Sequence, residues 1–341
     1  MPLNVIVEWL RVLKKVISGG LSKMFSTNVV KKLNVFFKKG VVRVSDSEPV
    51  VKKKYSVYGN CQADPLGNIL RTNPDFNEQW EFVQFPKPSF ELRKNDLPEI
   101  EKLVGQLDLF VTQNVGDSHG VFASDNLAKL LKPSSTVIRI PNAYFSGYMP
   151  EVVYFRDGEP HVTKFCDYHD EKFLSFFMED PVNAVNKAVN AANDTNTYSR
   201  DFVIENAKNS LEELKNRELS CDVTVSDYIE KHWREEILFF SMNHPKRKVL
   251  NHIASQVLSR IGQSSTDVRG DYEHLDNTRL PVYQSVKDVL LGDIEWTLAL
   301  RQQDIDLQTY YEGHAKVLRS LEPEFLRNAY KKFLEKRNIA Y

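Results

Sequence analysis

Residues 55–140 alternate short apolar runs, typical of buried strands, with stretches whose apolar residues recur every three or four positions, as in helices. Strands are expected over residues 55–58, 80–85, 107–112 and 136–140, and helices just after residue 62 and over 96–107 and 124–131. Strands that alternate with helices pair in parallel, because each helix returns the chain to the same end of the sheet. The sequence therefore predicts an α/β fold, with a parallel sheet and flanking helices in the N-terminal half.

The pattern changes at about residue 165. Apolar residues three and four apart predict helices over 167–178, 181–192, 198–217, 225–240, 246–261, 286–291 and, with internal breaks, 294–335. No repeat of fixed period is present, which excludes a solenoid. We therefore expect an α/β catalytic core over residues 55–165 and a mostly helical C-terminal half, residues 166–341, that completes the site.

The first 54 residues form a basic segment. They contain twelve Lys or Arg against three acidic residues, a local charge of +9, whereas the whole chain carries −1 and the remainder therefore −10. Two amphipathic patterns, one with Trp9 and one with Phe36 and Phe37, predict basic helices that can lie on an anionic membrane surface. Alternatively, they pack onto the main domain or a second subunit. Because no later stretch continues a basic groove, we expect no nucleic-acid partner.

Sequence features also predict where the protein resides. No apolar run reaches the about 18 residues that a membrane-spanning helix needs, and Glu8 and Arg11 interrupt the only candidate signal peptide. The three cysteines are widely spaced and odd in number, which indicates a reducing compartment. We expect a cytoplasmic protein whose residues 1–44 can contact the inner face of the membrane or another protein, with residues 45–54 as a linker.

The first predicted strand leads into a tight turn with the sequence Gly59-Asn60-Cys61-Gln62. Gly59 lets the backbone turn sharply and Asn60 can cap the helix that follows, so Cys61 is expected at a helix N-terminus. Unpaired N–H groups and the helix dipole at that position favour a thiolate, the nucleophilic form of cysteine. The alternative is that Cys61 is a small buried apolar residue.

Three of the predicted strands end in amide side chains. Asn60 follows the first strand, Gln113 and Asn114 follow the third, and Asn142 follows the fourth. The carboxyl ends of parallel strands share one edge, where ligands bind, so we expect these amides near Cys61. Amide groups can hold a developing oxyanion without adding charge. The alternative is that each one only makes a turn.

Three short motifs carry a resemblance: GNCQ at residues 59–62, TQN at 112–114 and NHP at 243–245. With them the chain resembles the WcbI-type polysaccharide biosynthesis family over about residues 55 to 320. Members of that family are bacterial, bind coenzyme A and are implicated in acetylating surface polysaccharides. The resemblance implies an acyltransferase with acetyl-coenzyme A as donor and a carbohydrate acceptor, which it does not identify.

The chain is also similar, more weakly, to the SGNH hydrolases, in which a nucleophile follows the first strand and a Gly and an Asn on later loops stabilise the oxyanion. Cys61 would replace the serine, and Asn114 would play the part of the Asn. The Asp-x-x-His string of that fold is missing, because Ser241 lies three residues before His244. This likeness supports an alternative function, a cysteine-dependent carbohydrate esterase with water as acceptor.

Pro245 is expected to end one helix and open the next, which would place Asn243 and His244 at the joint. His244 is our candidate general base for Cys61 or for the acceptor hydroxyl, since imidazole titrates near neutral pH. A structural or capping histidine is the alternative.

The residues expected to bind coenzyme A are Gly59, Gln62, Asn243, Lys246 and Arg247. Lys246 and Arg247 begin a predicted helix, where cations and N–H groups together can bind phosphates, although a solvated charged face explains them equally well. No metal is expected. His169 lies close to Asp167 and Asp170 in the sequence, but no second cluster at ligand spacing supports a metal site.

The predicted reaction transfers an acyl group, expected to be acetyl, from coenzyme A to a sugar hydroxyl of a bacterial surface polysaccharide. In one version Cys61 takes the acetyl group as a thioester, His244 deprotonates the sugar, and Asn60, Gln113 or Asn114 hold the oxyanion. In the other version His244 activates the sugar for direct attack and Cys61 only shapes the pocket. A non-catalytic scaffold for glycan assembly is a further alternative.

Overall fold

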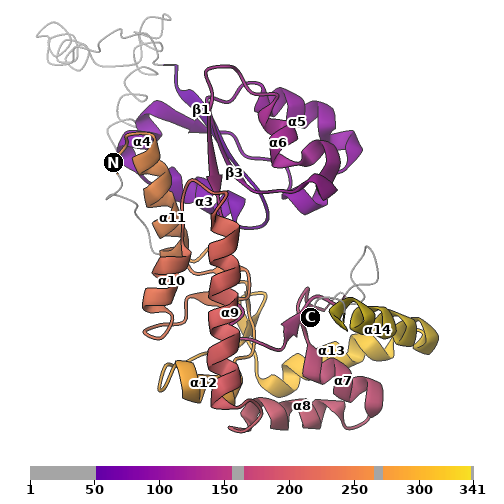
Figure 1. Cartoon of the computed structure of the whole chain (residues 1–341). Coiled ribbons are helices and arrows are strands. Elements are labelled where there is room, and N and C mark those ends of the chain that lie inside the picture. Colours follow the sequence, from indigo (N-terminus) through magenta and orange to yellow (C-terminus); the bar gives the residue numbers. More distant parts are fainter. Residues whose placement is uncertain (1–50, 156–164, 265–271, 339–341) are drawn as a thin grey trace, which may run out of the picture. The chain divides into compact units, whose positions relative to one another are not determined.

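The structure, a computed structural model, describes residues 51–155, 165–264 and 272–338. Residues 52–341 form one compact unit, and the fold below is that of this unit (Figure 1). The basic helices expected within residues 1–44 lie outside the described residues, as does most of the linker. The predicted domain boundaries at residues 54 and 165 stay predictions.

The N-terminal half contains a parallel four-stranded sheet, as predicted. Its strands are β1 (Lys53–Tyr58), β2 (Trp80–Phe82), β3 (Leu109–Gln113) and β4 (Thr136–Ile140), in the order β2-β1-β3-β4. Strand β3 is buried along its whole length, as expected for a central strand of a covered parallel sheet. Tyr58 pairs with Thr112, and Gln113 pairs with Ile140. The carboxyl ends of β1, β3 and β4 therefore share one edge.

Helices cover both faces of this sheet. Helix α3 (Ala63–Leu70) packs on the face that carries Tyr55 and Val57, and α5 (Leu97–Val104) packs on the face that carries Tyr58. Alternate residues of a strand point to opposite faces, so one strand contributes to two apolar clusters. The shorter elements are α4 (Pro74–Gln79), α6 (Ser124–Ala128), η2 (Ser89–Glu91), η3 (Lys94–Asp96) and η4 (Asp117–Phe122).

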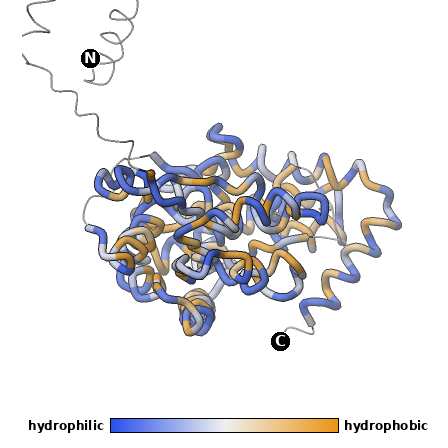
Figure 2. The backbone as a smooth tube through the Cα atoms, turned by 90° about the horizontal axis from the view of Figure 1, so that it is seen from above, coloured by the Kyte–Doolittle hydropathy of each residue, from blue (hydrophilic) through white to orange (hydrophobic). Residues whose placement is uncertain are grey.

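The C-terminal half is mostly helical, which confirms the second part of the fold prediction. Its helices are α7 (Glu171–Glu179), α8 (Ala184–Asn193), α9 (Arg200–Glu218), α10 (Ser226–His232), α11 (Arg247–Arg260), α12 (Gln284–Leu290), α13 (Leu307–Arg319) and α14 (Pro323–Asn338). Figure 2 shows hydrophobic and hydrophilic stretches alternating along the backbone, as amphipathic helices around a core require.

Small antiparallel sheets lie between these helices. Strand β5 (Val152–Val153) pairs with β6 (His169–Asp170), and β7 (Phe239–Ser241) pairs with β8 (His244–Pro245). The last sheet contains β9 (Thr278–Arg279), β10 (Ala299–Leu300) and β11 (Gln303–Asp304) in the order β11-β10-β9.

Two predictions for this half are wrong. Residues 225–240 do not form one helix, because α10 ends at His232 and β7 begins at Phe239. The cause is the short buried run at residues 237–240, whose unbroken apolar character does not distinguish a strand from a helix. Pro245 does not join two helices either, since it lies with His244 in strand β8.

One apolar core connects the two halves. Helix α3 packs against α11 (Figure 1), and Leu66 and Ile69 of α3 belong to the same buried cluster as Ile253 and Val257 of α11. The helical half therefore covers the α3 face of the sheet. It also brings Asn243 to the carboxyl edge of the sheet, where the main-chain carbonyl of Asn243 accepts a hydrogen bond from the side chain of Gln62.

Candidate active site

Gly59 ends strand β1 and begins the turn that carries the cysteine. The backbone at Gly59 passes directly against the side chain of Gln113, so that an added Cβ would clash with the amide oxygen Oε1 of Gln113. This close approach, together with a φ of +159°, requires glycine at this position.

The turn after Gly59 leads into helix α3. The side-chain oxygen Oδ1 of Asn60 accepts the N–H of Gln62 at 3.0 Å, and the carbonyl of Asn60 accepts the N–H of Ala63 at 3.0 Å. Asn60 thus closes the turn before the helix, but the predicted cap is wrong: the N-cap of α3 is Gln62, and no side chain makes a capping hydrogen bond there. Cys61 lies within this turn, at the N-terminal end of α3, as the sequence predicted.

Gln62 is the centre of a buried amide network. Its Nε2 lies 2.8 Å from Asn142 Oδ1, from the carbonyl of Ala143 and from the carbonyl of Asn243. Its Oε1 accepts from the N–H of Ala143 at 3.1 Å and from Nε2 of Gln113 at 3.2 Å. The side chain is only 2% exposed, so every one of these polar groups depends on the others for its hydrogen bonds.

Asn60 and Gln113 extend this network to the edge of the sheet. Gln113 Oε1 accepts the N–H of Asn60 at 2.8 Å, and Nδ2 of Asn60 donates to Asn142 Oδ1 at 2.9 Å. The structure therefore brings together three strand ends with their amides, beside Cys61. Their mutual bonds hold the turn rigid, which is what preorganised donors at a reaction centre require.

Asn114 is not part of this network. Its Nδ2 donates to Ser220 Oγ at 2.8 Å, and its Oδ1 accepts from Arg139 Nη1 at 3.2 Å. The side chain is exposed and ties the end of β3 to the chain that follows α9. The structure thus places Asn114 among surface groups, apart from the amides around Gln62.

Cys61 is half-buried and lines a cavity of about 80 Å³ together with Gly59, Asn60, Asp64 and Lys87. Burial raises the pKa of its thiol to about 11, the negative charge of Asp167 raises it as well, and a backbone hydrogen bond only partly opposes these effects. The sequence predicted the opposite, a thiolate favoured by the helix terminus. Desolvation outweighs the helix terminus here, so the thiol is protonated at neutral pH.

His244 lies beside Tyr168, whose ring meets the imidazole edge-on at 5.6 Å between centroids. Tyr168 donates its hydroxyl hydrogen to Oδ1 of Asn243 at 2.6 Å, which positions the hairpin that carries both Asn243 and His244. Burial lowers the pKa of His244 to about 4, while Asp167 and a backbone hydrogen bond with Leu275 oppose the shift. The imidazole is therefore neutral at pH 7, the form that accepts a proton.

Asp167 connects the cysteine with the histidine electrostatically. Its charge raises the pKa of Cys61 and also that of His244, and Cys61 in turn acts on Tyr168. Residues 61, 167, 168 and 244 therefore share one electrostatic environment, although they come from the first turn of the sheet and from two segments of the helical half. Asp167 is exposed, which leaves it accessible from solvent.

Lys246 and Arg247 have partners within the protein. The N–H of Arg247 donates to Glu273 Oε2 at 2.7 Å, so a carboxylate of the chain already occupies the N-terminus of α11. The ammonium of Lys246 lies 5.4 Å from the ring centroid of Phe240 and 5.6 Å from that of Trp296, in cation–π contact with both. The structure thus surrounds this predicted phosphate-binding pair with an acid and aromatic rings.

Sequence reasoning missed Tyr168 and the electrostatic influence of Asp167 on Cys61 and His244. Asp167 was considered only as part of a metal cluster, and among the described residues no group of three or more His, Cys, Asp or Glu is placed to hold a metal ion. Tyr168 has no local motif to mark it, because its partners Asn243 and His244 lie about 75 residues away.

The fold and the site define a class: an α/β protein whose parallel sheet presents a cysteine, held by buried amides, at the carboxyl edge of its strands. The chain belongs to the WcbI polysaccharide biosynthesis enzyme family, whose model matches residues 54–266. The resemblance stated from the motifs is thereby confirmed.

The comparison with solved structures agrees with this assignment. The chain is similar to a structure described as WcbI, a novel polysaccharide biosynthesis enzyme, in the native form without a disulfide bond between coenzyme A and one of its cysteines. The TM-score is 0.69 at 23% sequence identity, over 82% of this chain and 98% of that one, which shows a shared fold. No curated protein matches the chain.

Proposed function

We propose that this chain is a coenzyme A-dependent O-acyltransferase that moves an acyl group, expected to be acetyl, to a hydroxyl of a sugar in a bacterial surface polysaccharide. The observation that carries the proposal is the placement of Cys61. Its thiol lines a cavity at the carboxyl edge of the sheet, on a turn that the amides of Gln62 and Gln113 hold, and shares its environment with His244.

The family supports a role in polysaccharide biosynthesis, and the description of the similar structure links coenzyme A with a cysteine of that protein. In this chain Cys61 is our candidate for that cysteine. Lys87 lines the same cavity and is our candidate cation for a coenzyme A phosphate, which would compete with Asp96 for the ammonium, 2.8 Å away. We therefore place the donor thioester at the Cys61 cavity, which Gly59 lines, and expect Gln62 and Asn243, which do not line it, to act by holding the turn in place.

Two chemical routes use these groups. In the covalent route, the sulfur of Cys61 attacks the acyl carbon, and His244 takes the thiol proton and returns it to the departing coenzyme A sulfur. His244 then takes the proton of the sugar hydroxyl, which attacks the acyl-cysteine, and returns it to the departing sulfur of Cys61. In the direct route, His244 takes the proton of the sugar hydroxyl, which attacks the donor thioester while coenzyme A leaves as the thiol. In the free chain the imidazole of His244 is neutral and can accept a proton in either route, but its pKa of about 4 makes it a weak base, so the proton must move as the new bond to the acyl carbon forms.

The negative oxygen that develops on the acyl carbon needs hydrogen-bond donors nearby. Asn60 and Gln113 are our candidates, because their side chains lie at the edge of the cavity-forming turn. Asn114 would have to leave Ser220 and Arg139 to take part.

The protein is proposed to act in the cytoplasm or at the inner face of the cell membrane, with residues 1–44 as its contact to the membrane or to glycan-assembly proteins. Among the residues that the structure describes, no helix is both long and apolar enough to cross a bilayer. The membrane or protein contact is tested by deleting residues 1–44 and following where the protein sediments in a cell lysate.

The first test is calorimetric titration of the full-length protein with coenzyme A and acetyl-coenzyme A, at low and at raised salt. We expect saturable binding that weakens with salt, because phosphates pair with cations. Intact mass after incubation with acetyl-coenzyme A then separates the routes, since the covalent route adds one acetyl group, which Cys61→Ser abolishes.

A matched control is Cys221→Ser, which removes another half-exposed cysteine whose thiol pKa burial also raises to about 11. This variant should still be acetylated in the covalent route. Absence of coenzyme A binding by the wild-type chain would contradict the acyltransferase, and turnover of aryl acetates without coenzyme A would instead indicate the esterase.

A further inference from the structure

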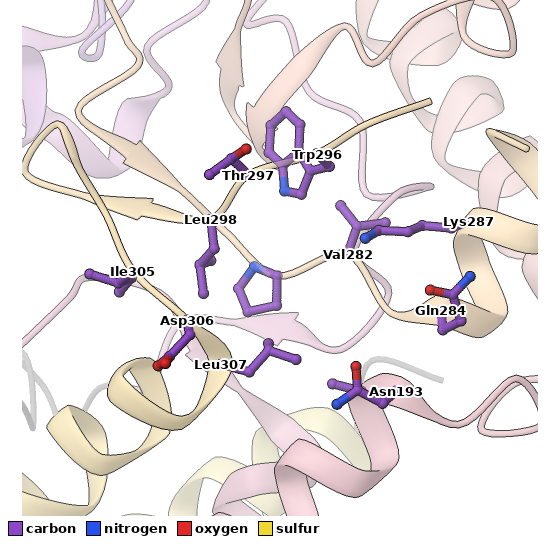
Figure 3. Close-up of a pocket in the computed structure, with 12 residues that line it drawn as sticks. Asn193, Val282, Gln284, Lys287, Trp296, Thr297, Leu298, Ile305, Asp306 and Leu307 are labelled. Carbon is purple, nitrogen blue, oxygen red and sulfur yellow. The ribbon is translucent and has the colours of Figure 1, made fainter. Parts of the chain in front are cut away.

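A second cavity, of about 280 Å³, lies in the helical half and shares no lining residue with the cavity at Cys61. Four segments line it: the end of α8, helix α12 with the residues before it, the segment before β10, and the start of α13. Figure 3 shows their side chains arranged around a common space. Nothing in the acyl-transfer proposal uses this cavity.

One wall of the cavity is apolar and contains an indole. Nε1 of Trp296 donates to the carbonyl of Leu280 at 2.7 Å, so its N–H is engaged, and Lys246 lies 5.6 Å from the ring centroid, which leaves carbon atoms of the ring to line the cavity. Phe240 stacks with Trp296 at 6.2 Å between centroids and keeps the indole in a defined orientation. The buried side chains of Val282 and Leu298 continue the apolar wall.

Polar groups surround this wall. Gln284 comes from the start of α12, Lys287 from its last turn, Asn193 from the end of α8, and Asp306 from the residue that caps α13. The amide Nε2 of Gln284 donates to Asp288 at 2.6 Å, which orients the side chain. The cavity therefore offers donors and acceptors next to an aromatic surface.

This combination fits a sugar ring better than other small ligands. A purely apolar ligand would bury the amides and the ammonium without hydrogen bonds, which is costly. A polyphosphate would meet one lining cation, Lys287, and one lining carboxylate, Asp306. A pyranose has an apolar C–H face and hydroxyls that both donate and accept hydrogen bonds. The volume of the cavity, about 280 Å³, is just below the roughly 300 Å³ at which drug-sized pockets begin, and it suits a single ring.

We propose that this cavity binds one pyranose unit of a glycan, with the C–H face of the ring on Trp296 and the hydroxyls on Gln284, Lys287 and Asn193. The site would bind a sugar unit of the polysaccharide other than the one whose hydroxyl reacts. The inference does not require acyl transfer, only a carbohydrate ligand.

The test is nitrogen-15 NMR of the tryptophan indole N–H groups in the full-length protein, titrated with the methyl glycopyranosides of glucose, galactose and mannose. The chain has four tryptophans, and Trp296→Phe assigns the relevant signal. We expect the Trp296 signal to shift saturably with at least one glycoside. The signals of Trp80 and Trp233, which are buried elsewhere, serve as internal controls and should not move.

Gln284→Ala should raise the dissociation constant for the glycoside about three- to tenfold, because one hydrogen bond is lost. Gln308→Ala is the matched control. Gln308 donates to Glu312, four residues later, just as Gln284 donates to Asp288, but Gln308 does not line the cavity. A Trp296 signal that none of the three glycosides moves would overturn the inference, as would Gln284→Ala binding like the wild type.

The same protein is titrated separately with coenzyme A, which should leave the Trp296 signal unchanged. Glycoside binding without coenzyme A binding would count against the proposed transferase and leave this site intact. Coenzyme A binding without glycoside binding would overturn the pyranose site and leave the proposed transferase intact.

Discussion

Nε2 of Gln62 donates to the main-chain carbonyl of Asn243 at 2.8 Å, across 181 residues of chain. This bond joins the turn after the first strand to the hairpin that carries His244. It explains how two motifs from opposite halves of the sequence meet at one site. Because Gln62 is buried, the bond is shielded from water and the two segments stay in fixed register.

Replacing Gln62 with leucine should destabilise the whole unit. The change leaves the buried N–H of Ala143 and the half-buried carbonyl of Asn243 without their partner, so we expect the free energy of unfolding to fall by about 3 kcal/mol. Urea unfolding followed by circular dichroism measures it. Gln84→Leu, on the exposed surface, should change it by less than about 0.5 kcal/mol. Equal unfolding midpoints for the two variants would show that the network is dispensable.

Gly59→Ala tests the close approach of the turn to Gln113. The new Cβ would clash with Oε1 of Gln113, which must move and release the N–H of Asn60, so we expect a loss of about 1 to 3 kcal/mol. Differential scanning calorimetry of the melting temperature measures the effect. At Gly116 an added Cβ meets no atom within 4 Å, so Gly116→Ala should melt like the wild type. If both variants melt alike, the turn is looser than described.

Asp167→Asn should lower two pKa values together. The carboxylate raises the pKa of Cys61 and that of His244, so its removal moves both downward from about 11 and about 4. The rate of iodoacetamide alkylation of Cys61 against pH measures the first, and histidine NMR titration measures the second. Asp293→Asn, at another exposed position, should move neither. An upward shift of either value would contradict the shared electrostatic environment.

The same pKa values predict the pH profile of the proposed acyl transfer. His244 must be neutral to take a proton, so kcat/KM should rise with pH through about 4 and then stay level across neutral pH, because the Cys61 thiol does not ionise until about 11. Initial rates at donor concentrations well below KM measure this profile, because kcat/KM then reports the free protein. A rate that keeps climbing across neutral pH would mean that a thiolate with a much lower pKa carries the reaction.

Glu151 predicts how stability depends on pH. Burial raises its pKa well above the usual 4.5, and the nearby Asp170 adds to the effect. A carboxyl with a raised pKa in the folded state contributes stability below about 4.5, which is lost as pH rises through the folded-state pKa. Glu151→Gln should therefore be more stable than the wild type at pH 8, by at least about 1 kcal/mol, and similar to it near pH 4.

Urea unfolding at pH 4 and pH 8 measures this difference. The exposed Glu179→Gln is the control and should show no such dependence on pH. A Glu151→Gln variant that is less stable than the wild type at pH 8 would show that the carboxylate is stabilised where it lies.

Much of the fold could be predicted from local patterns. Strand β4 has the expected limits, and the turn with Cys61 lies between β1 and α3 as expected, because apolar period and turn residues act over a few positions. The secondary-structure predictions fail at short apolar runs. Residues 239–241 form a strand because they pair with the hairpin that contains His244, a partner that helical periodicity does not reveal.

The sequence by itself determined the class of fold, the family, and the presence of a cysteine with amides at three strand ends. Only the tertiary structure decided what these residues do for one another. It made Gln62 the buried centre of the network, directed Asn114 to Ser220, filled the N-terminus of α11 with Glu273, and kept the Cys61 thiol protonated. The physical reason is that burial and long-range hydrogen bonds depend on partners far away in the chain, whereas turns and periodicity depend on neighbours.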